Sequence, residues 1–359
     1  MSSQPLYPML LAPIFKDKIW GGRLMEKKLN KKLPPDELIG ESWELSDYRT
    51  DITHVENGPL AGMSLDTLFS ERALELIGRT PVAGEGENFP LLTKFIDSNL
   101  LLSLQVHPPD SYALAHDREN GKTECWYVVH AEPGATVMRG LEPGTTPGDF
   151  RKGLDTGRGI EEMVRRFEVS SGDFIFMPTG VVHAICEGTI ILEIEQNSDM
   201  TYRLYDWGRM GADGKPRPTH IEKGMDVIDF EDTSPDKIEG ILRHEGGNRI
   251  RHMVSCRYFS VEILELSSTF RQDTGGKSFV ALTVVEGSAG ITGEGGEKLE
   301  VQTGDTVLLP ARPSKSTITP GRGGCKLVKA YLDITHKRFM EPLMRSGVPM
   351  EKIERHIFR

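Results

Sequence analysis

Two pairs of polar side chains in the stretch 101–129 have types and spacings that suit a metal site. Gln105 and His107 lie two positions apart, and Lys122 and Glu124 repeat that spacing after an insertion that begins with two prolines. Side chains two apart on a strand point to the same face, so each pair presents its polar groups together. An amide oxygen, an imidazole and a carboxylate on converging faces are donors that a divalent cation accepts.

A second imidazole comes from His183, at the start of a further expected strand and directly after the turn "PTG". Two imidazoles, a carboxylate and an amide oxygen suit Zn²⁺ and leave positions for a substrate. The structural alternative for His107 and His183 is a satisfied core or surface group, which is the commoner role of a lone histidine. Glu124 is harder to explain that way, because its neighbours at 125–127 indicate a buried strand and an unpaired buried carboxylate is costly. We therefore expect a cation to face Glu124.

The elements that must position these groups are short strands. Gly and Pro, 38 and 22 in number, separate β-branched and aromatic runs, which is typical of a sandwich or barrel. The expected strands are 89–97, 101–107, 123–130, 173–178, 189–196, 279–287 and 305–310. Helical patterns are few and predict helices over 64–78, over a short segment that starts at Pro108, and over 159–167.

Two segments, 172–178 and 304–310, each contain Gly-Asp, four strand residues and Pro. This pattern is also ordinary hairpin punctuation, but its recurrence indicates an internal repeat. The first copy has His183 five positions after its Pro, where the second has Lys315. The repeat therefore predicts two related barrels, of which only the first keeps the metal chemistry.

A chain of 359 residues is comfortable for two domains and needs no metal simply to fold. We expect an N-terminal catalytic barrel with helical insertions over 1–240, a degenerate barrel over 241–336, and an extension over 337–359. The polar stretch 231–250 is the expected connection between the barrels.

Composition excludes several classes of partner. The net charge of −10, without basic blocks, argues against nucleic acid and against an anionic membrane surface. Four scattered cysteines without a CxxC pair indicate buried thiols in a reducing compartment. With no apolar N-terminal signal and no long apolar run, we expect a cytoplasmic protein, monomeric or homodimeric.

The segment "GDFIFMPTGVVHAI" resembles the second cupin signature, with matches at Gly172, Pro178, Gly180 and His183. Glu187 stands where the signature usually closes with Asn. The first cupin signature normally has His-x-His followed closely by Glu. This chain departs from it, with Gln105 for the first His and the long stretch 108–123 before Glu124.

These departures point to one branch: the sequence resembles the type I mannose-6-phosphate isomerases of the short bacterial kind. Six blocks in the family order carry the resemblance, at 15–22, 40–48, 90–98, 102–110, 121–128 and 191–209. The resemblance implies an all-β fold of two cupin-type jelly-roll barrels with a few short helices. It also implies one zinc ion per chain, with ligands at Gln105, His107, Glu124 and His183.

The resemblance further implies interconversion of mannose 6-phosphate and fructose 6-phosphate through an enediol, with active-site polar residues at Ser103, Lys122, Glu193 and Arg203. Carboxylates serve as bases for enolisation, which favours Glu193 for proton transfer, with a surface salt bridge as its alternative. Lys122 and Arg203 suit an oxyanion or a phosphate, Ser103 suits a sugar or phosphate oxygen, and Lys94 adds positive potential. For Arg203 the alternative is an ion pair with Asp199 or Asp206.

Two other functions stay open at this point. A metal-dependent cupin oxygenase would commonly use three histidines and one glutamate, so the amide at Gln105 and the cations Lys122 and Arg203 weigh against it. A non-catalytic sugar-binding cupin would tolerate loss of acid-base residues, yet each expected one is present. The tryptophans are expected in the core or at a rim rather than as sugar platforms.

Overall fold

Strands dominate the architecture. A computed structural model describes residues 5–79, 88–211 and 213–358. Strands make up 42% of the chain, and the described residues also form seven short α-helices. The expectation of a strand-built fold is confirmed at this level; the described sheets run as open paths of strands.

Two sheets build the part of the chain that carries the expected metal ligands. The six-stranded sheet has the order β12 (Phe174–Met177), β9 (Glu124–Ala131), β14 (Thr189–Gln196), β7 (Leu91–Ser98), β3 (Ile39–Leu45) and β2 (Ile14–Gly22). The five-stranded sheet has the order β11 (Val164–Glu168), β10 (Thr136–Leu141), β13 (His183–Ile185), β8 (Leu104–Val106) and β15 (Tyr202–Tyr205).

The eleven-stranded sheet gathers most of the remaining strands: β16 (Ile241–Glu245), β17 (Asn248–Cys256), β18 (Ser260–Leu266), β23 (Lys315–Tyr331), β20 (Val280–Gly293), β22 (Thr306–Leu309), β1 (Met9–Ala12) and β6 (His54–Val55), with β19 (Phe270–Asp273), β21 (Lys298–Gln302) and β24 (Ile357–Phe358) alongside. A small ribbon joins β4 (Asp47–Tyr48) and β5 (Asp51–Ile52).

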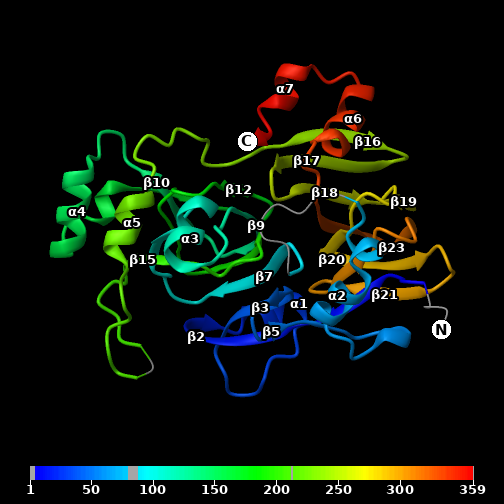
Figure 1. Cartoon of the computed structure of the whole chain (residues 1–359), viewed down its shortest axis with the longest axis horizontal. Coiled ribbons are helices and arrows are strands. Elements are labelled where there is room, and N and C mark those ends of the chain that lie inside the picture. The colour runs from blue at the N-terminus through cyan, green and yellow to red at the C-terminus, as the bar shows by residue number, and fades with distance from the viewer. Residues whose placement is uncertain (1–4, 80–87, 212, 359) are drawn as a thin grey trace.

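The helices are α1 (Leu24–Leu29), α2 (Leu65–Leu76), α3 (Asp110–Asp117), α4 (Pro147–Thr156), α5 (Ile221–Val227), α6 (Lys337–Arg345) and α7 (Met350–Glu354). Figure 1 shows α4 and α5 together at one end of the molecule, and α6 and α7 beside β16 and β17. None of the described helices has the length and apolar character needed to span a membrane.

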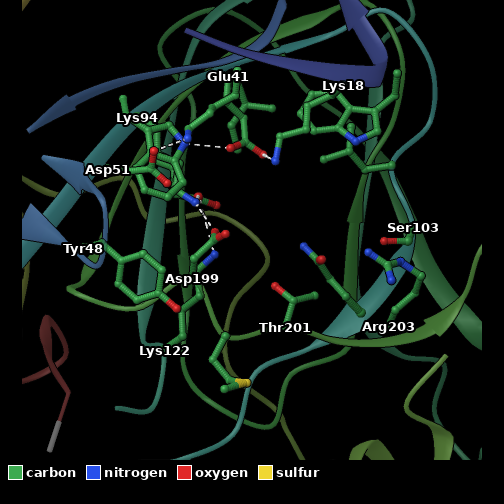
Figure 2. Close-up of a pocket in the computed structure, with 18 of the residues that line it drawn as sticks. Lys18, Glu41, Tyr48, Asp51, Lys94, Ser103, Lys122, Asp199, Thr201 and Arg203 are labelled. Carbon is green, nitrogen blue, oxygen red and sulfur yellow. Dashed lines mark hydrogen bonds and ion pairs between the residues drawn. The ribbon is translucent and has the colours of Figure 1, made fainter. Parts of the chain in front are cut away.

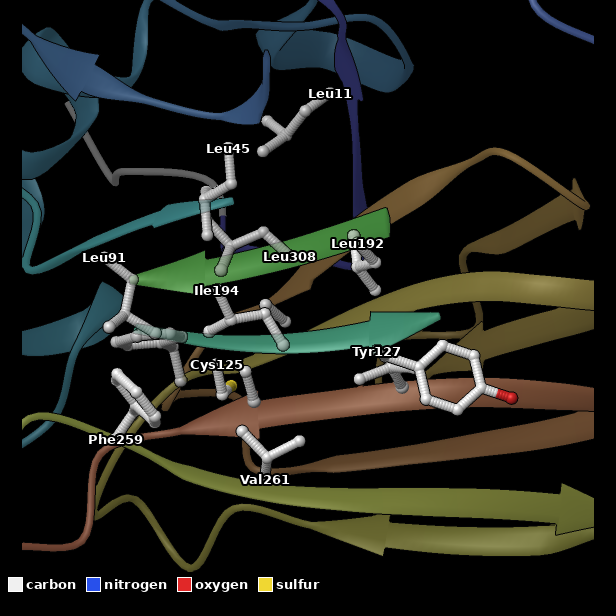
Figure 3. Packing of buried hydrophobic residues seen from close by; sticks show 14 of the residues in the cluster. Leu11, Leu45, Leu91, Cys125, Tyr127, Leu192, Ile194, Phe259, Val261 and Leu308 are labelled. Atoms are coloured by element: carbon white, nitrogen blue, oxygen red, sulfur yellow. The ribbon is translucent and has the colours of Figure 1, made fainter. Parts of the chain in front are cut away.

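Alternation along β14 decides which side chains reach the site. All eight of its residues are buried, so both faces of the strand are covered. Ile190, Leu192 and Ile194 pack into the largest apolar cluster, which joins this sheet to the eleven-stranded sheet (Figure 3). Because successive strand residues point to opposite faces, Glu193 and Glu195 are directed to the other face, between the six- and five-stranded sheets.

The predicted repeat has the same geometry in both copies. Gly172 and Gly304 adopt φ of 98° and 99°, a left-handed conformation that glycine tolerates. The amide of each glycine donates at 2.8 Å to the carbonyl of a neighbouring strand, Val128 in the first copy and Val284 in the second. The same hydrogen bonds therefore turn the chain into β12 and into β22.

Helix predictions are partly confirmed. The pattern over 64–78 forms α2, and the segment after the prolines forms α3, which begins at Asp110 rather than at Pro108. The helix predicted over 159–167 is wrong, because only Glu161–Met163 makes a 3-10 turn and the chain continues as β11. β11 pairs with β10, so sheet pairing outweighs the weak helical pattern of this segment.

The polar stretch 231–250 is not irregular along its whole length. Residues 231–240 form no helix or strand, whereas β16 starts at Ile241 and β17 at Asn248.

Candidate metal centre and its cavity

Three of the four expected metal ligands converge between the two smaller sheets. Glu124 Oε2 lies 3.3 Å from His107 Nε2, and Glu124 Oε1 lies 3.5 Å from His183 Nε2. One ligand atom from each of the three lies within 4.8 Å of the others, and all three side chains are buried. His183 pairs with Gln105 across β13 and β8, which brings the expected amide to the same place.

The histidine hydrogen bonds leave the right nitrogens free for a cation. The Nδ1 atoms of His107 and His183 lie 2.7 and 2.8 Å from the carbonyl oxygens of Met200 and Val181. A carbonyl only accepts, so each Nδ1 carries the proton and donates it, and each Nε2 keeps its lone pair. This is the orientation that backbone partners impose on metal-binding histidines.

A further observation supports the fit of a cation to this donor set. His107 Nε2 and both oxygens of Glu124 are buried and make no hydrogen bond to a described residue, although the Lys122 ammonium lies 3.1 Å from Glu124 Oε2. Such groups are costly unless something binds them. Gln105 completes the set less directly, because its amide nitrogen lies 3.2 Å from His183 Nε2. Amide N and O are interchangeable by a half-turn, so the same side chain can present its oxygen.

Electrostatics keep these donors in the forms that bind metals. Burial, with Lys122 nearby, lowers the pKa of His107 to about 4, and burial also lowers the pKa of His183. Burial alone would raise the pKa of Glu124, but Lys122 and His107 outweigh it and hold that pKa well below its ordinary value. At neutral pH the site therefore presents two neutral imidazoles and one carboxylate.

Beside the donors lies a lysine–carboxylate cluster formed by Lys94, Lys122, Glu193, Glu195 and Asp199. Lys94 Nζ lies 2.7 Å from Asp199 Oδ1 and 3.0 Å from Glu195 Oε1, and Lys122 Nζ lies 2.7 Å from Glu195 Oε2. Lys122 also lies 3.1 Å from Glu124 Oε2, so the cluster touches the metal donors.

The indole of Trp126 donates a 3.0 Å hydrogen bond to Glu193 Oε1. The carboxylates of the cluster hold the pKa values of both lysines above their ordinary range, although burial alone would lower them. Both lysines are therefore ammonium groups at neutral pH.

A cavity of about 690 Å³ opens above this cluster. It is lined by Ser103, Gln105 and Glu193 together with a set of cations: Lys16, Lys18, Arg49, Lys94, Lys122, Arg203 and Arg217. Figure 2 shows Arg203 and Ser103 on one side of the cavity and Lys94, Asp199 and Tyr48 on the other. A cavity of this size holds a small polar molecule, and its cations favour an anionic one.

Arg203 differs from the other cavity cations because it has no carboxylate partner within 4.0 Å among the described residues. Lys16, Lys18, Arg49 and Arg217 pair with Asp51, Glu41, Glu119 and Asp206, in that order. The alternative of an ion pair between Arg203 and Asp199 or Asp206 is therefore wrong. Arg203 Nη1 donates to the carbonyl of Pro218 at 2.9 Å, while its buried Nε has no hydrogen-bond partner among the described residues.

Sequence reasoning missed much of the opposite wall. Glu41 lies 3.0 Å from Lys18 and accepts a 2.7 Å hydrogen bond from the indole of Trp43. Trp20 and Trp43 are buried in apolar clusters and also line the cavity, which agrees with the expected packing in the core or at a rim. The signal was present, since these residues belong to the blocks 15–22 and 40–48.

The fold and the site define a strand-built protein with a candidate metal centre beside a cation-lined cavity. Residues 9–124 match the family "Phosphomannose isomerase type I, catalytic domain", and residues 249–332 match "Mannose-6-phosphate isomerase, cupin domain". The chain belongs to the type I phosphomannose isomerase family, and its C-terminal part contains a cupin domain.

Two bacterial relatives support this assignment along most of the chain. Mannose-6-phosphate isomerase ManA of Bacillus subtilis is 36% identical over 320 residues, which are 86% of this chain and 94% of that protein. The mannose-6-phosphate isomerase of Streptococcus mutans is 35% identical over 304 residues, 84% of this chain and 92% of that protein.

Solved structures agree. The crystal structure of the mannose 6-phosphate isomerase from Bacillus subtilis matches with a TM-score of 0.82 at 32% identity, covering 90% of this chain and 99% of that one. The apo phosphomannose isomerase of Salmonella typhimurium matches with a TM-score of 0.71 at 15% identity, over 91% of this chain and 99% of that one, and shows the shared fold.

Proposed function

We propose that this chain is a zinc-dependent aldose-ketose isomerase that interconverts mannose 6-phosphate and fructose 6-phosphate through an enediol. The observation that carries the proposal is the convergence of His107 Nε2, Glu124 and His183 Nε2 beside a cationic cavity. Lys122 connects the two, because it lines the cavity and its Nζ lies 3.1 Å from Glu124 Oε2. Gln105, from the paired strand, is the proposed fourth ligand. Membership of the family supplies the substrate, because curated members carry this activity in their names.

The charge balance of the buried groups favours a divalent cation. Lys94 and Lys122 contribute two positive charges, and Glu124, Glu193, Glu195 and Asp199 contribute four negative ones when all are ionised. One divalent cation on Glu124 and the histidines makes this group neutral, which is the inexpensive state for buried charges. Burial and the neighbouring Glu193 raise the pKa of Glu195 well above its ordinary value, so a further positive charge nearby would favour its ionised form.

Bound at these ligands, zinc would act as a Lewis acid that polarises the carbonyl and hydroxyl of the open-chain sugar. Glu193, held by Trp126 and lining the cavity, is the proposed group for proton transfer between C1 and C2 or between their oxygens. The Lys122 ammonium faces the same cavity and stabilises the developing oxyanion, with Lys94 adding positive potential.

The other side of the cavity is the proposed binding surface for the phosphorylated end of the sugar. Arg203 offers a guanidinium without a carboxylate partner among the described residues, and its planar fork matches phosphate oxygens. Ser103 stands beside it and offers a hydroxyl to a sugar or phosphate oxygen (Figure 2). The oxygenase and the non-catalytic alternatives explain neither this cation nor the acid-base groups opposite it.

The proposal extends to the organisation of the chain. We assign residues 1–240 to a catalytic jelly roll with helical insertions, 241–336 to a degenerate jelly roll, and 337–359 to an extension. The matching turns at Gly172 and Gly304 support this division. We also infer a cytoplasmic enzyme that acts as a monomer or homodimer, with neither nucleic acid nor membrane as partner.

Metal removal tests the function. Dialysis against a chelator should abolish conversion of mannose 6-phosphate to fructose 6-phosphate in a coupled assay, and Zn²⁺ should restore it. Elemental analysis of the same sample should give one zinc per chain, and Glu124→Gln should retain none. Glu262→Gln is a matched control, because Glu262 is also a buried carboxylate and pairs with Lys329 at 2.9 Å outside the site. Full activity in metal-free protein would contradict the proposal.

A further inference from the structure

Glu195 is a fully buried carboxylate of the site that does not line the cavity. It has no exposed surface, and in the β14–β9 pairing it stands directly opposite Glu124. Its two oxygens lie 3.0 Å from Lys94 Nζ and 2.7 Å from Lys122 Nζ. Both lysines do line the cavity, so Glu195 lies behind them as their shared counter-ion.

The two lysines depend on Glu195 to different degrees. Lys94 has another close partner, Asp199, at 2.7 Å. The other carboxylates near Lys122 are farther away, with Glu124 at 3.1 Å and Glu193 at 3.6 Å. Glu195 is therefore the nearest counter-ion of Lys122, whereas Lys94 keeps a close partner without it.

We propose that Glu195 is a positioning residue that holds the Lys122 ammonium against the cavity and limits its pairing with the metal ligand Glu124, which is the next nearest carboxylate. An ammonium on a flexible four-carbon stem loses much rotamer freedom when it is held in one place, so a fixed partner is needed. Without the charge of Glu195, the nearest carboxylate to Lys122 is Glu124, and pairing there competes with the cation and moves the ammonium from the substrate. This role rests on the proposed isomerase function.

The first test is Glu195→Gln, which keeps the shape of the side chain and removes its charge. We expect kcat to fall about 30-fold, with little change in KM. This fall is smaller than the ~10²-fold or larger fall in kcat that follows outright loss of an oxyanion-stabilising group. The primary isotope effect with mannose 6-phosphate deuterated at C2 should rise, because a misplaced Lys122 slows proton transfer itself. Glu262→Gln, which removes the partner of buried Lys329, should leave the isotope effect unchanged.

A mutant cycle tests whether Glu195 acts through Lys122. In a Lys122→Met background, Glu195→Gln should cause less than a threefold further loss of kcat. In a Lys94→Met background the same substitution should still cause most of its effect, because Lys122 is present. Zinc content, measured in each variant, identifies losses that reflect missing metal rather than misplaced lysine.

Three results would overturn the role of Glu195: an unchanged isotope effect in Glu195→Gln, a loss that falls only on KM, or losses that multiply fully in the Lys122→Met background. Each of these leaves wild-type isomerisation intact. Failure of the proposed function is a different result, since the unmodified chain loaded with zinc would then not convert mannose 6-phosphate.

Discussion

Arg203 offers the sharpest test of how the cavity holds its ligand. Its Nη1 is engaged by the Pro218 carbonyl, and its Nε is buried without a partner among the described residues. Burial, with Arg217 nearby, lowers the pKa of Arg203, so the guanidinium is held at a cost that an anionic ligand can offset.

Arg203→Ala should therefore remove about two charge-assisted hydrogen bonds to the substrate, each worth roughly 2 kcal/mol. The resulting loss of about 4 kcal/mol corresponds to a fall in kcat/KM of about 10³-fold. Zinc content should stay near one per chain, because Arg203 is not among the converging ligands. Arg203→Lys should recover only part of the loss, since an ammonium lacks the planar fork.

The assay compares mannose 6-phosphate with unphosphorylated mannose, each followed to its ketose. If Arg203 holds the phosphate, the large penalty appears only with the phosphorylated sugar. Arg49→Ala is the matched control, because Arg49 lines the same cavity but is paired with Glu119 at 2.8 Å and is 66% exposed; it should change kcat/KM less than threefold. Unaltered kinetics in Arg203→Ala would refute the assignment of this residue to the substrate.

Two further predictions concern stability. Burial lowers the pKa of His252 from 6.5 to about 4, so the unfolded chain takes up this proton at a higher pH than the folded chain and the folded state loses stability as pH drops below 6.5. Between pH 8 and pH 5, the free energy of unfolding of wild type, measured in urea, should fall by about 2 kcal/mol more than that of His252→Gln. Equal losses in the two proteins would contradict this prediction. Gly172→Ala and Gly304→Ala both strain a positive φ, but only at Gly304 would the new Cβ meet a backbone atom, the carbonyl oxygen of Leu29 at 2.4 Å. Gly304→Ala should therefore be about 2 kcal/mol less stable than Gly172→Ala, and matching thermal midpoints would show that the contact relaxes freely.

The strand faces that carry the polar residues of the candidate metal centre were predictable because strand periodicity is local. Two-residue spacing puts Gln105 beside His107 and Glu193 beside Glu195, and the turn before His183 has a recognisable sequence. The same rule separates Glu193 from its apolar neighbours on β14, which face the core. The helix prediction from local pattern was wrong over 159–167, because the pairing of β11 with β10 outweighed the helical spacing of apolar residues in this segment.

The partners of these residues were not predictable, because they come from segments far away along the chain. Glu41 reaches the cavity only because β3 pairs with β7, a strand that begins fifty positions later. Among the described cavity cations, Arg203 likewise lacks a carboxylate partner. This depends on tertiary packing, which decides which carboxylates come within 4.0 Å of each cation.

The sequence by itself determined the kind of chemistry, since residue types and two-residue spacing specify donors and the strand faces that carry them. Only the tertiary structure decided how those donors meet. Sheet pairing sets β13 against β8 and β9 against β14, and this brings His183 to Gln105 and Glu124 to Glu195. The physical reason is that side-chain direction is a property of a few consecutive residues, whereas convergence and ion pairing depend on the packing of whole sheets.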